Sequence, residues 1–287
     1  MHAAYKVAWQ KFKAFCRENG RGYLPAEPHT VALFVAKLLV EGIPKSVPTA
    51  LAAIKKQHEF ADIPAPINSL ELKQLKEGIA KGHKTSSVRR ARPLSVNDIE
   101  RMGEEIDRSN LIQLRNFALV TIMFAGFLRR AEVANLRTED VEFADEHIIL
   151  QISSSKTDQS GTGAKVKIAR GQRKATCPAR ALELYLAKAG IKSRYLFRTC
   201  TAAKATRCGL SVNRVNEIVK EMVAMVGLDP AKFSSHSARR GGATSAAAAG
   251  NPARLIKRHG RWKSEAVNAY IDDSLDNQLK VSKSLKL

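Results

Sequence analysis

Three short stretches of the chain hold the side chains best suited to chemistry. Phe127–Leu136 contains two adjacent arginines and a glutamate, His236–Gly242 reads HSARRGG, and His259–Ser264 (HGRWKS) is followed shortly by Tyr270. An arginine carries a permanent positive charge, an imidazole can transfer a proton near neutral pH, and a phenol can act as a nucleophile. Residues of these types could attack an anionic ester if the fold brought them into one site.

Taken singly, each stretch has an ordinary explanation. Arg129 and Glu132 could form an ion pair between helix positions i and i+3, worth only a few tenths of a kcal/mol. His236 and Arg239 could be a surface pair. Tyr270 could be an amphipathic core tyrosine, as most tyrosines are. The order of the three stretches along one chain is therefore more informative than any one of them.

Together the stretches resemble the tyrosine recombinases of the phage integrase type, most closely their Cre-like branch. That family carries an arginine with a carboxylate three residues later, a β-turn lysine, an HxxR pair, a histidine or tryptophan, and a tyrosine nucleophile near the C-terminus. The matching positions, in family order, are Arg129, Glu132, Lys156, His236, Arg239, Trp262 and Tyr270. The resemblance covers nearly the whole chain and is strongest over Phe233–Gly242 and the GRWKS run. One departure is that Tyr270 follows Trp262 by eight residues, where many relatives have nine.

The resemblance implies an enzyme that breaks and rejoins DNA strands without a metal or ATP, and elementary chemistry agrees. A tyrosine has a reference pKa of about 10, so only about one in a thousand is ionised near pH 7, a deficit of roughly 4 kcal/mol. His236 is the natural acceptor of the phenolic proton. Arg129 and Arg239 can each present a planar donor fork to the non-bridging phosphate oxygens. Attack by Tyr270 would leave a 3′-phosphotyrosine and a free 5′ hydroxyl, which conserves the bond energy.

The resemblance also assigns roles to the other family positions. Lys156, expected in a turn between two strands, would protonate the departing 5′ oxygen, although Lys165 and Lys167 compete for that role. Glu132 would orient the cationic side chains rather than act on the substrate. Trp262 would donate its indole N–H to the phosphate.

Charge and composition support a polyanionic partner. The chain has 287 residues, with 48 Lys and Arg against 27 Asp and Glu, so its formal net charge is +21. A merely soluble basic protein is the alternative, but self-repulsion at this charge opposes folding and nucleic acid is the usual reason for it. No stretch is apolar over the roughly 20 residues that a membrane span needs. We expect no cofactor and no metal, because phosphate-binding glycine motifs are absent and no CxxC pair or metal-ligand spacing involves the four cysteines, which are Cys16, Cys177, Cys200 and Cys208.

The length and the pattern of apolar residues predict two domains in a mainly α (α+β) fold. Residues 1–80 are expected to form an N-terminal four-helix core-binding domain, and the basic, acid-free segment 81–93 to be a linker. Residues 94–287 are expected to form a mostly helical catalytic domain with a small antiparallel sheet and a C-terminal docking helix. The expected helices of the first domain are Tyr5–Phe15, Thr30–Val40, Val47–Phe60 and Leu70–Ile79, and the expected strands of the second are Val141–Phe143, His147–Ile152 and Lys165–Ile168. Everything from Cys177 onward is expected to be helical.

Helix starts and the linker supply candidate DNA-binding side chains. The run Ser211–Arg214 opens a predicted helix that matches the family's second major-groove helix, where arginine pairs with guanine and asparagine with adenine. A solvated helix face with polar caps is the alternative. The candidates are Lys45, Ser46, Thr49, Arg89, Arg90, Ser211, Asn213 and Arg214.

We therefore predict a site-specific recombinase that acts on double-stranded DNA at two short, near-palindromic sites as a homotetramer. One alternative is a type IB-like topoisomerase, which would act as a monomer; the short helical first domain argues against it. The other is a non-catalytic, sequence-specific DNA-binding regulator, which would not need Tyr270 or Lys156. Such a protein would work in the cytoplasm or nucleoid, or in the nucleus if the source is eukaryotic.

Overall fold

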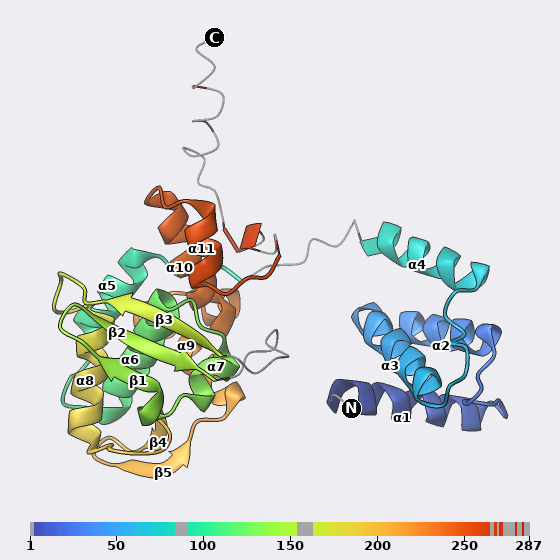
Figure 1. Cartoon of the computed structure of the whole chain (residues 1–287), viewed down its shortest axis with the longest axis horizontal. Coiled ribbons are helices and arrows are strands. Elements are labelled where there is room, and N and C mark those ends of the chain that lie inside the picture. Colours follow the sequence, from blue (N-terminus) through green and yellow to red (C-terminus); the bar gives the residue numbers. More distant parts are fainter. Residues whose placement is uncertain are drawn as a thin grey trace. The chain divides into compact units, whose positions relative to one another are not determined.

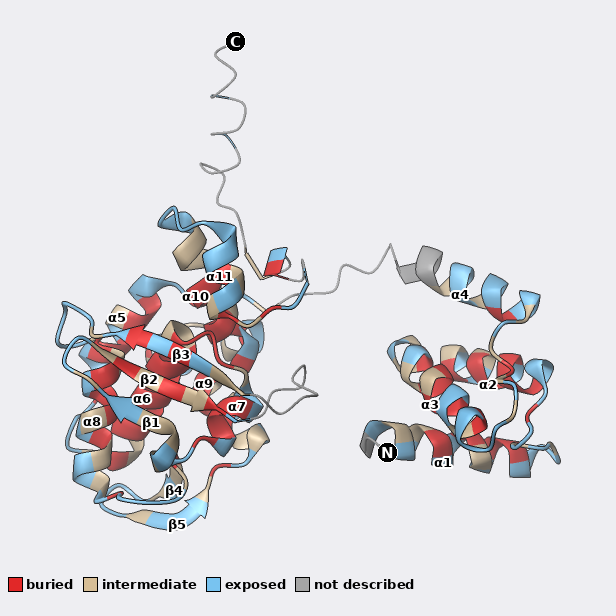
Figure 2. Ribbon diagram, viewed as in Figure 1, coloured by how far each residue is buried: buried red, intermediate tan, exposed pale blue. Residues whose placement is uncertain are grey.

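The computed structural model describes residues 3–83, 91–153, 163–264, 267–268 and 270–271, together with residues 279 and 283. The chain divides into two compact units, Met1–Arg89 and Arg90–Leu287, and each unit has its own buried core (Figure 1; Figure 2). The division falls inside the segment 81–93 that the sequence predicts to be a linker.

Over its described residues, the first unit contains four α-helices: α1 (Ala3–Glu18), α2 (Pro28–Val40), α3 (Val47–Phe60) and α4 (Leu70–His83). Proline stands at the start of α2 and α3, where a missing backbone N–H costs nothing. All four helices were predicted, but α4 continues to His83 and so extends into the predicted linker.

The core of the first unit is aromatic. Phe12 lies against Phe34 with ring centroids 5.2 Å apart, and Ile54 of α3 is fully buried beside them. His58 is also fully buried: its Nε2 accepts a hydrogen bond from the Ala26 N–H at 3.0 Å, and its Nδ1 lies 2.9 Å from the Ile54 carbonyl oxygen. A ring held in this way carries its proton on Nδ1 and ties α3 to the loop before α2.

The described part of the second unit is mostly helical and contains two small sheets. Its helices are α5 (Val96–Glu105), α6 (Leu111–Ala125), α7 (Arg130–Asn135), α8 (Pro178–Ala189), α9 (Val212–Met225), α10 (Ser235–Ala248) and α11 (Ala253–His259). Its strands are β1 (Val141–Phe143), β2 (His147–Ile152), β3 (Ala164–Ala169), β4 (Arg198–Cys200) and β5 (Ala205–Gly209). Among the described helices, none is long and apolar enough to cross a membrane.

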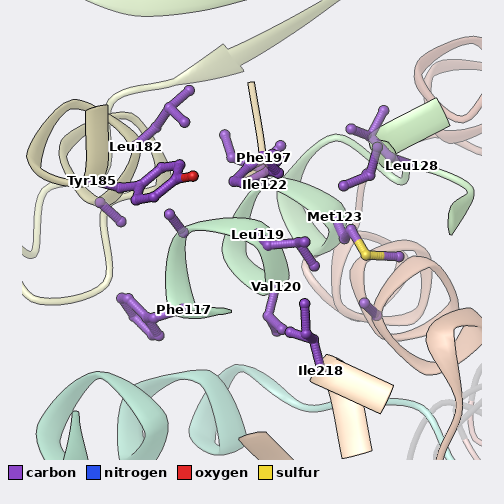
Figure 3. Close-up of a cluster of buried hydrophobic side chains, with 14 of the residues drawn as sticks. Phe117, Leu119, Val120, Ile122, Met123, Leu128, Leu182, Tyr185, Phe197 and Ile218 are labelled. Carbon is purple, nitrogen blue, oxygen red and sulfur yellow. The ribbon is translucent and has the colours of Figure 1, made fainter. Parts of the chain in front are cut away.

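Helix α6 runs through the centre of this unit and is buried almost all round (Figure 2). Figure 3 shows its side chains between those of neighbouring elements, with Leu182 and Tyr185 from α8 on one side and Ile218 from α9 on another. A helix that buries side chains around its whole circumference needs neighbours on every face. Because α6 is enclosed, its C-terminal end is a fixed point from which the next loop and α7 start.

The predicted three-stranded antiparallel sheet is present, in the order β1-β2-β3. Ile148 pairs with Ile168 and Leu150 with Val166, and these side chains are buried while their neighbours along β3 are exposed. The alternation of apolar and polar residues that predicted these strands is thus the burial pattern of a sheet with one covered face.

The prediction that the chain is helical throughout from Cys177 is wrong between residues 198 and 209. There β4 and β5 form an antiparallel hairpin, in which Arg198 pairs with Gly209 and Cys200 with Ala205. Both strands are short and mostly exposed, so their sequence lacks the alternating apolar residues by which a half-buried strand is recognised.

Two glycines let α10 approach its neighbours closely. A Cβ atom on Gly241 would lie 2.0 Å from the carbonyl oxygen of Leu94, and one on Gly242 would lie 2.1 Å from the carbonyl oxygen of Phe124. The Leu94 N–H also donates to the Ser237 carbonyl at 3.0 Å. The GG pair in HSARRGG therefore sets the position of α10 against the end of α6.

Candidate active site

The structure brings six of the seven predicted catalytic residues to one place. Arg129 and Glu132 lie at the start of α7, His236 and Arg239 lie on α10, and Trp262 and Tyr270 follow α11. The seventh, Lys156, falls outside the described residues, as does most of the turn between β2 and β3. The rival lysines Lys165 and Lys167 lie on β3 with exposed side chains.

Glu132 holds Arg129 at the first turn of α7. The Arg129 backbone N–H donates to Glu132 Oε2 at 2.8 Å, and Arg129 Nη1 donates to Glu132 Oε1 at 2.6 Å. The side chain of Glu132 is 2% exposed and that of Arg129 is 20% exposed. Arg129 therefore keeps a side of its guanidinium open to solvent, while Glu132 serves as its fixed support.

Helix α10 presents His236 and Arg239 one turn apart. The helix starts where it does because Ser234 caps it: Ser234 Oγ accepts from the His236 N–H at 3.2 Å, and Ser237 Oγ accepts from the Ser234 N–H at 3.0 Å. The spacing of three residues puts both functional side chains on one face of the helix. His236 is exposed, whereas Arg239 is completely buried.

Arg239 is anchored by two backbone carbonyls. Its Nη2 donates to the Gly260 carbonyl at 2.6 Å, and its Nη1 donates to the Phe127 carbonyl. Within the described residues its Nε has no hydrogen-bond partner. Burial and the positive charge of Arg129 lower the pKa of Arg239, because both disfavour the charged form. This guanidinium is therefore placed where an anion would stabilise it.

Two aromatic rings lie next to this buried cation. The Arg239 Cζ atom is 4.1 Å from the centroid of the Trp262 ring and 5.5 Å from that of Tyr270. The Trp262 and Tyr270 centroids are 5.1 Å apart, and those of His236 and Tyr270 are 6.4 Å apart. Thr244 Oγ1, on α10, donates to the Tyr270 carbonyl at 3.2 Å. Tyr270 is thus held beside both members of the HxxR pair.

Gly260 makes room for Trp262 in this arrangement. A Cβ atom on Gly260 would lie 1.7 Å from Cζ3 of the indole ring. The chain turns so sharply here that Trp262 folds back over the preceding turn. Glycine is consequently required between α11 and the tryptophan for steric reasons.

The charges around His236 favour its neutral form. Although the residue is exposed, the protein packed around the imidazole removes part of its solvation and lowers its pKa, and the guanidinium groups of Arg130, Arg239 and Arg129 lower it further. A histidine that is neutral at pH 7 can accept a proton. A neutral ring is what the predicted role of His236 as a base requires, and that role stays a prediction.

Sequence reasoning missed Arg261 and His259. Arg261 Nη2 donates to Glu132 Oε2 at 2.8 Å, so that one carboxylate binds two arginines. His259 Nε2 lies 2.8 Å from the Ala125 carbonyl oxygen, and its ring meets that of Phe127 edge-on at 4.6 Å. Both residues belong to the HGRWKS run that was singled out. Only the fold shows that their side chains turn inward.

The ionisation of Glu132 depends on these arginines. Burial raises the pKa of the carboxyl group, but the charge of Arg261 and the hydrogen bonds from Arg129 outweigh burial, so the pKa lies below its ordinary value. Glu132 is therefore an anion at neutral pH. Within the described part of the chain, no group of three or more His, Cys, Asp and Glu side chains could hold a metal ion.

The candidate DNA-binding residues lie on both units. Lys45 is exposed, Thr49 is half-buried, and Ser46 Oγ donates to the Ile43 carbonyl at 2.6 Å. Arg89 and Arg90 lie outside the described residues.

At the start of α9, Ser211 is the N-cap, and its Oγ accepts from the Arg214 N–H at 3.1 Å. Asn213 is exposed at the same helix end. The Arg214 side chain is paired with Glu217 at 3.0 Å and with Glu221 at 3.1 Å. Asn213 is therefore open to a partner, while Arg214 would have to leave its carboxylates to reach one.

The phage integrase family matches residues 92–276 of the chain. The integrase/recombinase xerD homolog of Selenomonas ruminantium is 32% identical over 279 residues, which cover 94% of this chain and 80% of that protein. Recombinase cre of Escherichia phage P1 is 25% identical over 272 residues, which cover 88% of this chain and 78% of that protein.

Among solved structures, the XerH site-specific recombinase in a post-cleavage complex with a palindromic difH substrate has a TM-score of 0.67 at 15% identity. The match covers 99% of this chain and 78% of that one. The similarity therefore extends over both units and includes the candidate active site.

Proposed function

The chain belongs to the phage integrase family and is a site-specific tyrosine recombinase, and we propose that Tyr270 is the nucleophile with which it cleaves and rejoins DNA. The observation that carries this proposal is the position of the Tyr270 ring, whose centroid is 5.5 Å from the Arg239 guanidinium carbon and 6.4 Å from the His236 ring. The family assignment agrees with the predicted family, and homology to Cre, the namesake of the predicted branch, is present.

In this mechanism the phenolic oxygen of Tyr270 attacks the scissile phosphorus, and the bond from phosphorus to the 5′ oxygen breaks. His236, whose pKa is lowered by partial loss of solvation and by nearby arginines, accepts the phenolic proton. The departing 5′ oxygen takes a proton from a general acid, the role that we assign to Lys156. The products are a 3′-phosphotyrosine and a free 5′ hydroxyl, and the same steps in reverse join a new strand.

Positive charge stabilises the pentavalent phosphate. Arg129 has its exposed side available for a non-bridging oxygen. The Nε–H of Arg239 has no partner among the described residues but is buried, so it becomes a further donor only when DNA displaces the aromatic side chains that cover it. Trp262 covers Arg239 and offers its indole N–H to the phosphate. Such fixed charges are usually the largest contribution to catalysis at sites of this kind.

The number of strands exchanged determines the oligomeric state of the active form. Recombination between two duplexes breaks four strands, and each protomer supplies one tyrosine, so the active form is a homotetramer on two near-palindromic double-stranded sites. The XerH match, which has a palindromic substrate, supports this reading. We further propose that residues 1–80 form the core-binding domain, that segment 81–93 follows the DNA backbone, and that the end of the chain docks on a neighbouring protomer.

DNA recognition is divided between the two units in this proposal. Asn213 reads bases from the start of α9, with Ser211 and Arg214 beside it, and Lys45, Ser46 and Thr49 contact DNA from the first unit. Arg89 and Arg90 contribute to the linker's electrostatic attraction for phosphates. The reaction takes place where DNA lies, in the cytoplasm or nucleoid, or in the nucleus if the source is eukaryotic.

The experiment that tests the proposal follows strand exchange between two duplexes. The bound sequence is first selected from random duplex DNA, and two fragments carrying it are then incubated with the protein without metal or ATP. We expect recombinant products from the wild type and none from Tyr270→Phe, which should still bind the site. Supercoil relaxation without exchange would instead indicate a topoisomerase, and binding without any covalent adduct would indicate a regulator.

A further inference from the structure

Arg261 occupies an unusual position at the edge of the active site. It follows Gly260 and precedes Trp262, and its φ angle of 58° lies in the left-handed region that favours glycine. Its side chain is only 10% exposed. A charged residue in this backbone conformation is uncommon, so the contacts of its side chain show what holds it there.

The guanidinium of Arg261 is directed into the protein. Nη1 donates to the carbonyl oxygens of His259 at 3.0 Å and Gly126 at 3.4 Å. Nη2 donates to the Phe127 carbonyl at 3.2 Å and to Glu132 Oε2 at 2.8 Å. Both terminal nitrogens are thus engaged by the protein, and the group is not presented to a phosphate in the way that Arg129 is.

Two of the four hydrogen-bond acceptors of Arg261 also bind a proposed catalytic arginine. Glu132 accepts hydrogen bonds from Arg261 and from Arg129. The Phe127 carbonyl accepts from Arg261 and from Arg239. Arg261 therefore connects the supports of both arginines, which come from α7 and α10.

On the basis of the proposed function, we propose that Arg261 is a positioning residue of the recombinase site. It fixes Glu132 and the Phe127 carbonyl so that Arg129 and Arg239 face one phosphate. It does not bind the phosphate itself. A displacement of about 1 Å in such a support can lower a catalytic rate by about 100-fold without any loss of a catalytic group.

The electrostatics of Glu132 give this role a distinct signature. The charged groups around Glu132 are Arg129 at its own helix start, Arg261, Arg239 on α10, and Asp140, which lines the same small cavity. Burial raises the pKa of Glu132, and Arg261 contributes the largest opposing charge. Removal of Arg261 should therefore raise the pKa of Glu132, so that the carboxylate is lost at a higher pH.

The test uses Arg261→Gly in the full-length chain. Glycine adopts the positive φ angle without strain, so the substitution removes the side chain and leaves the backbone as it is. Arg194→Gly is the matched control: Arg194 is exposed and also has a positive φ, 69°, so that this variant removes one arginine and relieves the same strain outside the site. Single-turnover cleavage of a nicked suicide substrate is measured from pH 5 to 9, with DNA affinity at several salt concentrations. Arg261→Lys, Glu132→Gln and the Glu132→Gln/Arg261→Gly double variant complete the set.

We expect Arg261→Gly to slow cleavage by about 10- to 100-fold and to leave DNA affinity and its salt dependence unchanged. We also expect its rate to fall more steeply at acid pH than that of the wild type, because Glu132 is then protonated in addition to His236. Arg261→Lys should recover part of the rate, and Arg194→Gly should match the wild type. In the Glu132→Gln background the Arg261 change should have a much smaller effect and should not move the pH profile, because the two residues act through one contact.

Three results would overturn the inference while leaving the proposed function intact. These are a normal rate and pH profile for Arg261→Gly, an equal loss of rate at every pH that also occurs in the Glu132→Gln background, or a flatter salt dependence, which would make Arg261 a phosphate contact. The proposed function fails separately, and the inference with it, if the wild type forms no covalent adduct on any nicked site that it binds.

Discussion

The guanidinium of Arg239 lies under the indole ring of Trp262, with Cζ 4.1 Å from the ring centroid. Arg239 has no exposed surface, so a charge that would be costly in an apolar interior is balanced by two carbonyl oxygens and an aromatic face. Trp262 in turn contacts Tyr270. The buried cation and the proposed nucleophile therefore share one aromatic neighbour.

Replacement of Trp262 should separate its two roles. Trp262→Phe keeps a ring over Arg239 but lacks the indole N–H, and the loss of a hydrogen bond to a charged group should slow cleavage by about 10- to 100-fold. Trp262→Ala also leaves a cavity and should destabilise the fold by about 3–5 kcal/mol. Single-turnover cleavage and denaturant unfolding measure the two effects. Wild-type cleavage by Trp262→Phe would show that the indole N–H has no part in the reaction.

Gly260 should not tolerate even one methyl group. In Gly260→Ala the added Cβ would meet the indole ring at 1.7 Å, so the turn or the tryptophan must move. We expect a loss of about 1–3 kcal/mol in the free energy of unfolding and a slower cleavage step. Gly78→Ala on α4 is the control, because its Cβ would meet nothing within 4 Å. If both variants unfold and cleave alike, the tight turn is not a requirement.

The rate of cleavage should fall at acid pH because of His236. Its pKa is lowered by partial loss of solvation and by Arg130, Arg239 and Arg129, so the neutral form persists below the ordinary pKa of about 6.5. The rate should be constant down to about pH 6.5 and decline below it as the base is protonated. In His236→Gln the rate should be about 100- to 10,000-fold lower, with this acid limb lost. An unchanged limb in that variant would assign the base to another group.

Protonation of His259 should also couple stability to pH. Burial lowers the pKa of His259 in the folded protein, with the charges of Arg261 and Arg239 adding to the effect. The unfolded chain therefore binds the proton more readily than the folded one. The contribution of His259 to the free energy of unfolding is complete above about pH 6.5. It is lost as the pH falls through the folded pKa, by about 1.4 kcal/mol per pH unit. The free energy of unfolding of the wild type and of His259→Gln, measured from pH 8 to 5, tests this contribution. Parallel curves would show no contribution from His259.

Much of the site was predictable because family order and local periodicity coincide. The HxxR spacing places His236 and Arg239 on one helical face whatever the tertiary structure. Likewise, the i, i+3 spacing of Arg129 and Glu132 is that of a helix start, and the structure has this contact at 2.6 Å. The four helices of the first unit and the three-stranded sheet followed from apolar periodicity.

Other features depend on contacts between distant parts of the chain, which periodicity does not encode. Arg261 is buried because Glu132, 129 residues earlier, lies opposite it. Gly241 and Gly242 are needed because the Leu94 and Phe124 carbonyls come so close. The hairpin at 198–209 was missed because its short, exposed strands carry no apolar alternation. The Arg214 side chain is paired with Glu217 and Glu221 of its own helix and so is not free to contact DNA. The sequence-based interpretation did not consider these two carboxylates.

The most direct test of the central claim identifies the residue that becomes linked to DNA. The chain has five tyrosines, and after a nicked suicide substrate has been cleaved, digestion and mass spectrometry locate the one that carries the nucleotide. We predict a 3′-phosphotyrosine at Tyr270 alone, and none in Tyr270→Phe. Attachment at another residue, or an adduct that persists in Tyr270→Phe, would contradict the account.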